Sequence, residues 1–161
     1  MTTIAVTGHM DLTDSSVPLV RDALRETLRP YADNLTGVSC IAKGSDSLFA
    51  EVVLDLGGRL VAIIPSKDYR QNKVKPDHVE TFDRLCAAAA EVVILEHESA
   101  NRSAYEDANR ALLKRADRLV AVWNGEPPSG KGGGTADTVL EARDAGLPVD
   151  VVWPGRAERR A

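Results

Sequence analysis

The stretch "GKGGGTAD", Gly130 to Asp137, places four glycines and a lysine directly before the threonine that begins a predicted helix. Glycines raise the entropic cost of ordering a loop, but they also let a ligand approach the backbone amides. The loop is therefore either a slack surface connection or an anion-binding turn at a helix N-terminus. We expect the second. The residues expected to contact the anion are Gly132, Gly133, Gly134 and Thr135.

A second loop, "AKGSD", follows a strand-like run and opens another predicted helix. The first amides of a helix lack intrahelical partners and point outward, where a phosphate can accept their hydrogen bonds. Lys43 would add a positive charge and Ser45 a hydroxyl. The alternative is that Ser45 or Asp46 only caps the helix. The candidate ligand residues of this loop are Lys43, Gly44, Ser45 and Asp46.

Four further side chains, with one arginine beside them, suit contacts to a base, a ribose or a phosphate. His9 follows the first predicted strand, although a lone histidine there could simply hydrogen-bond within its loop. Tyr105 and Asn109 lie four residues apart on one helix face, with Arg102 one turn earlier. The alternative for Tyr105 is a place in the core. Trp123 ends a buried strand, and its indole either closes a pocket or caps the core.

Two carboxylates follow the glycine loop, Asp137 in the first helical turn and Glu141 one turn later. Asp137 could accept a ribose hydroxyl, cap the loop, or lie there because carboxylates favour helix N-termini. Two common nucleotide motifs are missing. No GxGxxG follows the first strand, and Lys131 precedes its glycines where a P-loop lysine follows them. We therefore expect neither an ordinary NAD dehydrogenase nor ATP hydrolysis by a P-loop.

Strands and helices alternate along the chain. Six short apolar runs read as strands: "TIAVTG", "GVSCIA", "RLVAIIP", "EVVILE", "RLVAVW" and "PVDVVW". They are continuously apolar, which is typical of parallel strands covered on both faces. Amphipathic stretches lie between them. The pattern predicts an α/β fold, namely a Rossmann-like, doubly wound, mostly parallel six-stranded sheet with helices on both faces in three α/β/α layers. The loops after each strand should then meet at one edge, where ligands bind.

Composition limits the remaining possibilities. A chain of 161 residues with 43% hydrophobic content fits one domain, which we assign to residues 1–154, followed by a short, disordered basic tail at 155–161. A net charge of −4 and 4% aromatic residues argue against nucleic acid as a partner. No signal peptide or membrane span is recognisable, so we expect a soluble, cytoplasmic protein. Cys40 and Cys86 lack metal-ligand spacing, so we expect free thiols, no metal and no cofactor.

Four stretches together resemble the SLOG superfamily, which includes the LOG-type "lysine decarboxylase-like" proteins and DprA-like domains. They are "VTGHMDL", "AKGSD", "YEDANRALLKRADRLVAVWNG" and "GKGGGTADTVLEARDAGLPV", and the likeness extends from Val6 to Trp153. The resemblance implies a Rossmann-like domain that binds nucleotides or nucleotide-derived ligands, often as a homo-oligomer. The positions that match its binding pattern are Thr7, Gly8, Lys43, Gly44, Ser45, Asp46, Asn109, Gly125, Gly133, Gly134, Thr135 and Asp137.

LOG enzymes hydrolyse the N-glycosidic bond of nucleoside monophosphates and hold the phosphate on a PGGxGTxxE loop. Here Gly134 and Thr135 fit the GT pair, but the final glutamate position holds Thr138. Asp137 or Glu141 would have to supply the carboxylate. The leading hypothesis is therefore binding of a nucleotide or another phosphoribosyl-containing molecule. A nucleotide N-glycosidase and a non-catalytic oligomeric structural protein are the alternatives.

Overall fold

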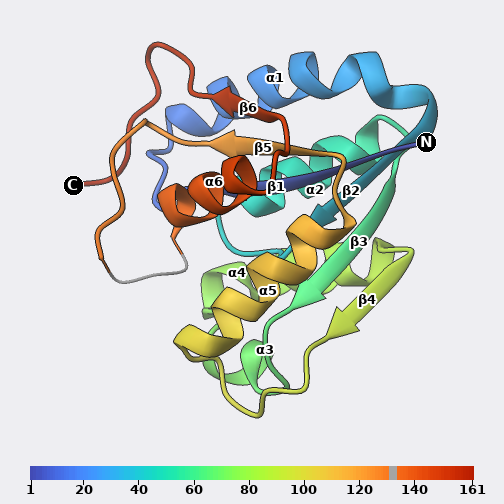
Figure 1. Cartoon of the computed structure of the whole chain (residues 1–161), viewed down its shortest axis with the longest axis vertical. Coiled ribbons are helices and arrows are strands. Elements are labelled where there is room, and N and C mark those ends of the chain that lie inside the picture. The colour runs from blue at the N-terminus through green and yellow to red at the C-terminus, as the bar shows by residue number, and fades with distance from the viewer. Residues whose placement is uncertain (131–133) are drawn as a thin grey trace.

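The computed structural model describes residues 1–130 and 134–161. Six strands form one parallel sheet in the order β4-β3-β2-β1-β5-β6 (Figure 1). The chain steps outward from β1 to β4 and then returns to the other side of β1 to form β5 and β6, so the strand order reverses between β1 and β5. The predicted six-stranded, doubly wound sheet is confirmed, and all five of its strand pairings are parallel. The strands are β1 (Thr2–Gly8), β2 (Leu35–Ser39), β3 (Arg59–Ile64), β4 (Glu91–Ile94), β5 (Arg118–Val122) and β6 (Val149–Val152).

Helices cover both faces of the sheet, as the apolar runs predicted. Along β1, Ile4 belongs to the same buried cluster as Val20 of the first helix, whereas Ala5 belongs to a cluster on the opposite face with Leu112. This alternation follows from the two-residue period of a strand. The helices are α1 (Ser16–Leu28), the 3-10 helix η1 (Arg29–Asn34), α2 (Ser45–Asp55), the short α3 (Tyr69–Asn72), α4 (Pro76–Ala88), α5 (Arg102–Arg115) and α6 (Thr135–Asp144). Helices α1, α2 and α4 pack on one face, and α5 and α6 pack on the other.

The second strand ends three residues before the predicted boundary. The Ser39 hydroxyl accepts a hydrogen bond from the Ile41 amide at 3.1 Å and donates one to the Asp46 carbonyl at 3.0 Å. Ile41 adopts a φ of +57°, which is uncommon for a β-branched residue and turns the chain out of the sheet. This turn directs Ala42 and Asp46 toward the edge where the strands end.

The C-terminal segment 155–161 packs against the loop after β1. An isolated antiparallel bridge joins Leu12 to Arg159, and the Thr13 amide donates to the Glu158 carbonyl at 3.1 Å. Figure 1 shows this segment, in red, returning to the side at which β5 ends. Among the residues that the structure describes, no helix is long and apolar enough to cross a membrane.

Candidate functional site

A cavity of about 650 Å³ opens at the carboxyl ends of β1 and β5, where the strand order reverses. Open α/β sheets bind ligands at this position, and the volume lies in the range of small-molecule sites. We call it the switch-point pocket. Its walls come from the loops after β1, β2, β3 and β5, from α5, from the first turn of α6 and from Arg159.

His9 joins the two central strands at the floor of this pocket. Its amide donates to the Val122 carbonyl at 3.1 Å, and its ring Nε2 accepts from the Asn124 amide at 3.1 Å. The ring also packs edge-on against Trp153, with centroids 5.5 Å apart. Burial, and after it the nearby charge of Arg159, lowers the pKa of His9. The imidazole is therefore neutral at pH 7, and because Nε2 accepts a hydrogen bond, its proton lies on Nδ1.

The start of α2 packs against the loop after β1 instead of facing the pocket with open amides. Both the amide and the hydroxyl of Ser45 donate to the His9 carbonyl, at 3.3 and 2.7 Å. Gly44 has a φ of +84°, and a side chain there would lie 2.7 Å from the Met10 carbonyl oxygen. Gly44 and Ser45 thus hold two loops together. Gly44 is the N-cap residue of α2 and no side chain caps this helix, so the capping role that the sequence left open is not formed by Ser45.

Asp46, one residue further along α2, does face the pocket. Its Oδ2 accepts a weak hydrogen bond from the Ala42 amide at 3.4 Å. The residue is half-buried at the pocket wall, and burial raises the pKa of its carboxyl to about 7. Burial also raises the pKa values of its neighbours Cys40 and Tyr69, so both of these side chains are neutral. A carboxyl with a strongly shifted pKa in a cleft is a candidate functional group.

The first turn of α6 forms the opposite wall. The Asp137 carboxylate accepts a hydrogen bond from the Gly134 amide at 3.2 Å, and the Thr138 hydroxyl donates to the Gly134 carbonyl at 3.0 Å. Asp137 therefore caps this helix, and its side chain still lines the pocket together with Thr135. Two expected anion contacts, Gly132 and Gly133, lie outside the described residues.

Carboxyl groups outnumber cations among the described lining residues. The acidic residues are Asp11, Asp46, Glu126 and Asp137, and the basic ones are Lys73 and Arg159. A negatively charged group of a ligand fits near one of the two cations or at the start of α6. The carboxyl groups of the lining favour ligand groups that donate hydrogen bonds, such as hydroxyl and amino groups.

The structure brings most of the predicted ligand residues together in this pocket. Those that line it are Thr7, Gly8, His9, Asp46, Tyr105, Asn109, Trp123, Gly134, Thr135 and Asp137. Those described residues that do not are Lys43, Gly44, Ser45, Arg102, Gly125 and Glu141.

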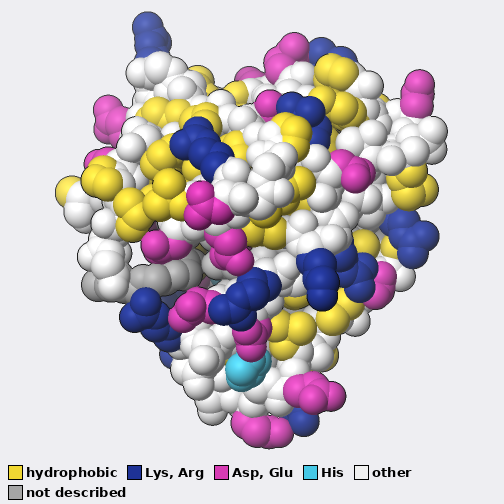
Figure 2. All heavy atoms as spheres, in the orientation of Figure 1, with side chains coloured by type: hydrophobic (Ala, Val, Ile, Leu, Met, Phe, Trp, Pro, Cys, Tyr) yellow, Lys and Arg dark blue, Asp and Glu magenta, His cyan; other side chains and the backbone are white. Residues whose placement is uncertain are grey.

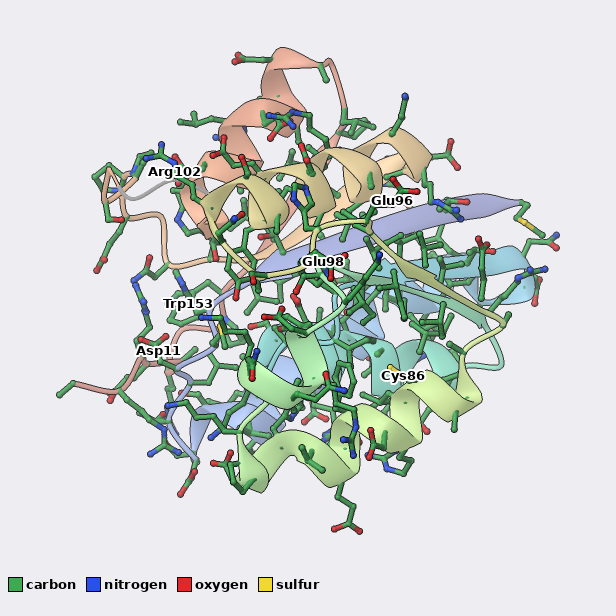
Figure 3. The ribbon with its side chains drawn as sticks, turned by 90° about the horizontal axis from the view of Figure 1, so that it is seen from below. Asp11, Cys86, Glu96, Glu98, Arg102 and Trp153 are labelled. Carbon is green, nitrogen blue, oxygen red and sulfur yellow. The ribbon has the colours of Figure 1, made fainter. Side chains whose placement is uncertain are left out.

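Two basic residues that the sequence predicted as ligand contacts, Lys43 and Arg102, make ion pairs outside the pocket. The Lys43 ammonium lies 2.6 Å from a carboxylate oxygen of Asp77 at the start of α4. Arg102 pairs with Glu106 at 3.1 Å, one turn along the same helix. Figure 3 shows Arg102 at the same side of the molecule as Asp11, but Arg102 is not part of the pocket wall.

Glu141, the second candidate carboxylate, lines a different depression and not the switch-point pocket. This outer groove, with a volume of about 910 Å³, runs between α5 and α6 and has apolar walls that include Leu113 and Leu147. Residue 141 is slightly more than one helical turn beyond Asp137, about 6 Å further along α6. The outer groove is larger than the switch-point pocket, but it lies away from the ends of β1 and β5.

Sequence reasoning missed several pocket residues that could contact a ligand, among them Asp11, Glu126, Tyr69, Lys73 and Arg159. Tyr69 and Lys73 follow β3, in a loop that the predicted fold already places at the ligand-binding edge. The position of Tyr69 and Lys73 after a predicted strand could therefore have identified them as candidate ligand contacts. Arg159 gave none, since its place depends on the bridge to Leu12, 147 residues earlier in the chain.

Several solved structures share this fold. The protein TM1055 is 22% identical, the match covers 92% of this chain and 72% of that one, and the TM-score is 0.61. DprA from Helicobacter pylori, whose structure describes a single-stranded DNA binding mode, is 16% identical, with 96% and 66% covered and a TM-score of 0.69. The molybdenum cofactor binding protein of Rippkaea orientalis is 15% identical, with 95% and 77% covered and a TM-score of 0.57.

No family model matches the chain, and no curated protein matches it by sequence. The chain corresponds to about two thirds of the H. pylori DprA chain. At such low identities the similarity concerns the fold alone. The chain shares the Rossmann-like fold of these proteins, which is the fold that the sequence resemblance predicted.

Proposed function

We propose that the switch-point pocket binds a nucleotide-derived small molecule that carries one anionic group and several hydrogen-bond donors. The observation that carries this proposal is the 650 Å³ cavity at the reversal point of a parallel sheet. The lining residues suit both the base and the polar groups of such a ligand. Tyr105 and Trp123 offer aromatic surface to a base, and the carboxyls of Asp46 and Asp137 can accept hydrogen bonds from amino or hydroxyl groups.

The related folds support more than one kind of ligand. The H. pylori protein is described with single-stranded DNA and the Rippkaea protein with the molybdenum cofactor, so the expectation that nucleic acid is an unlikely partner is not supported. We favour a small molecule because the described lining residues include four carboxyls and two cations, a balance that disfavours a polyanion. Figure 2 shows acidic and basic side chains interspersed on the face that carries α5 and α6, without a continuous basic stripe.

Calorimetric titration tests the proposal with AMP, cyclic AMP, NAD, ADP-ribose, ribose 5-phosphate and a single-stranded oligonucleotide. The Gly134→Val variant adds a branched side chain to the pocket wall at a position with an ordinary φ, where the nearest atom to a new Cβ is 3.5 Å away. We expect this variant to fold and to lose affinity for the bound nucleotide. Ala145→Val, at the exposed far end of the same helix, serves as the control and should bind normally. Binding of the oligonucleotide alone would contradict the proposal.

A second candidate function is hydrolysis of an N-glycosidic bond, which the pKa of Asp46 near 7 favours. The protonated carboxyl would give its proton to the leaving base nitrogen while water adds to the sugar carbon. The water keeps one of its protons in the new sugar hydroxyl, and its other proton passes to the Asp46 carboxylate. Release of free base from AMP should be lost in Asp46→Asn and retained in Glu141→Gln. Binding without base release would leave the chain a binding protein. Homo-oligomerisation and a cytoplasmic location stay predictions.

A further inference from the structure

We propose that the C-terminal segment 155–161 is part of the binding site, and that the guanidinium of Arg159 holds the anionic group of the ligand. This inference rests on the proposed function, because it assigns a role in recognising the same ligand. It also replaces Lys43, the cation that the sequence suggested for this task. The structure supports it through the anchoring of the segment, the orientation of the guanidinium and the scarcity of other cations among the described lining residues.

The backbone on both sides of Arg159 is fixed to the start of α1 and the loop before it. The Glu158 amide donates to the Ser16 hydroxyl at 2.7 Å, and that hydroxyl lies 3.2 Å from the Glu158 carbonyl. On the other side, the Arg160 amide donates to the Asp11 carbonyl at 2.6 Å. These bonds hold the position of Arg159 in the pocket wall before any ligand arrives, which lowers the entropy lost on binding.

The Arg159 side chain is oriented but not fully engaged. Its Nε donates to Asp11 Oδ1 at 2.8 Å, and this bond fixes the plane of the guanidinium. Its terminal Nη1 makes only a longer ion pair, 3.7 Å from Glu126 Oε2. The Glu126 side chain is 67% exposed, so an incoming anion can displace it into water without burying an unpaired charge. A guanidinium held in this way can bind a phosphate or carboxylate through its terminal nitrogens.

Few other cations compete for this role among the described residues. Among the described lining residues only Lys73 and Arg159 are basic, and Lys43 and Arg102 make ion pairs outside the pocket. Arg159 and His9 both line the pocket, and the positive charge of Arg159 contributes to the lowered pKa of His9. The neighbouring Arg160 provides a matched control, because its side chain pairs with the exposed Asp14 and does not line the pocket.

The experiment compares AMP with adenosine, its uncharged counterpart, by calorimetric titration of the full chain. We expect Arg159→Ala to weaken AMP binding about 10- to 100-fold, the effect of losing a charge-assisted hydrogen bond, and to leave adenosine binding unchanged. Arg160→Ala should bind both compounds like the wild type. Glu126→Gln removes the competing carboxylate and should strengthen AMP binding, an opposite effect that loosening of the segment would not produce.

The outcomes separate this inference from the proposed function. Equal loss of AMP and adenosine affinity in Arg159→Ala, or no loss of either, would overturn the role of Arg159 while leaving the pocket as the binding site. If the wild type binds neither compound, the AMP-based function fails, and inorganic phosphate becomes the probe. A phosphate-dependent shift of the His9 ring signals that disappears in Arg159→Ala would then support the inference, and no shift would overturn it.

Discussion

Asp46 lies in the first turn of α2 with its carboxyl in the pocket, where burial raises its pKa from 3.8 to about 7. Between these two values the unfolded chain has released the proton that the folded protein keeps. The free energy of unfolding should therefore fall with rising pH in this window, by up to about 1.4 kcal/mol per pH unit from this group. Asp46→Asn should remove that slope. Urea unfolding at several pH values between 4 and 7 measures it, and parallel curves for variant and wild type would contradict the assignment.

His9 reports on the same pocket from the other side. Burial and the positive charge of Arg159 both lower its pKa. Arg159→Ala removes the second influence, so the pKa of His9 should rise in that variant, whereas Arg160→Ala should leave it unchanged. Titration of the ring signals by NMR measures both. An unaltered His9 pKa in Arg159→Ala would mean that the guanidinium does not lie beside the imidazole.

The contact between the loop after β1 and the start of α2 depends on Gly44. Both Gly44 and Gly57 have positive φ angles, +84° and +79°, so alanine at either site should cost about 1–2 kcal/mol of unfolding free energy. At Gly57 nothing lies within 4 Å of the new Cβ, whereas at Gly44 it would clash with the carbonyls of His9 and Met10. Gly44→Ala should therefore be the more destabilising of the two by chemical denaturation. Equal losses would show that the loop contact is unimportant.

Local pattern predicted the elements better than their ends. The continuous apolar runs identified all six strands, because a buried parallel strand needs no polar face. The end of β2 was wrong because the turn depends on the Ser39 hydroxyl and the left-handed Ile41, neither of which a hydropathy pattern shows. The contacts of the C-terminal segment could not be predicted for a similar reason. Its three arginines suggest a solvated tail, and its bonds to residues near the N-terminus join positions far apart in the chain.

For the whole molecule, the topology predicted which loops meet but not how their polar groups are used. The loops after β1, β2 and β5 do converge on one pocket, as the parallel sheet required. The sequence could not show that the first amide of α2 would bond to His9, or that Lys43 would turn to Asp77. Such choices depend on distances between elements far apart in the chain.

The central claim, that the switch-point pocket binds a nucleotide-derived ligand, is tested most directly by following backbone amide signals of labelled protein during titration with AMP. The account predicts shifts at the pocket residues Gly8, His9 and Thr135, and none at Ala111 and Ala145 in the outer groove. Shifts confined to the outer groove, or no shifts at saturating AMP, would contradict it.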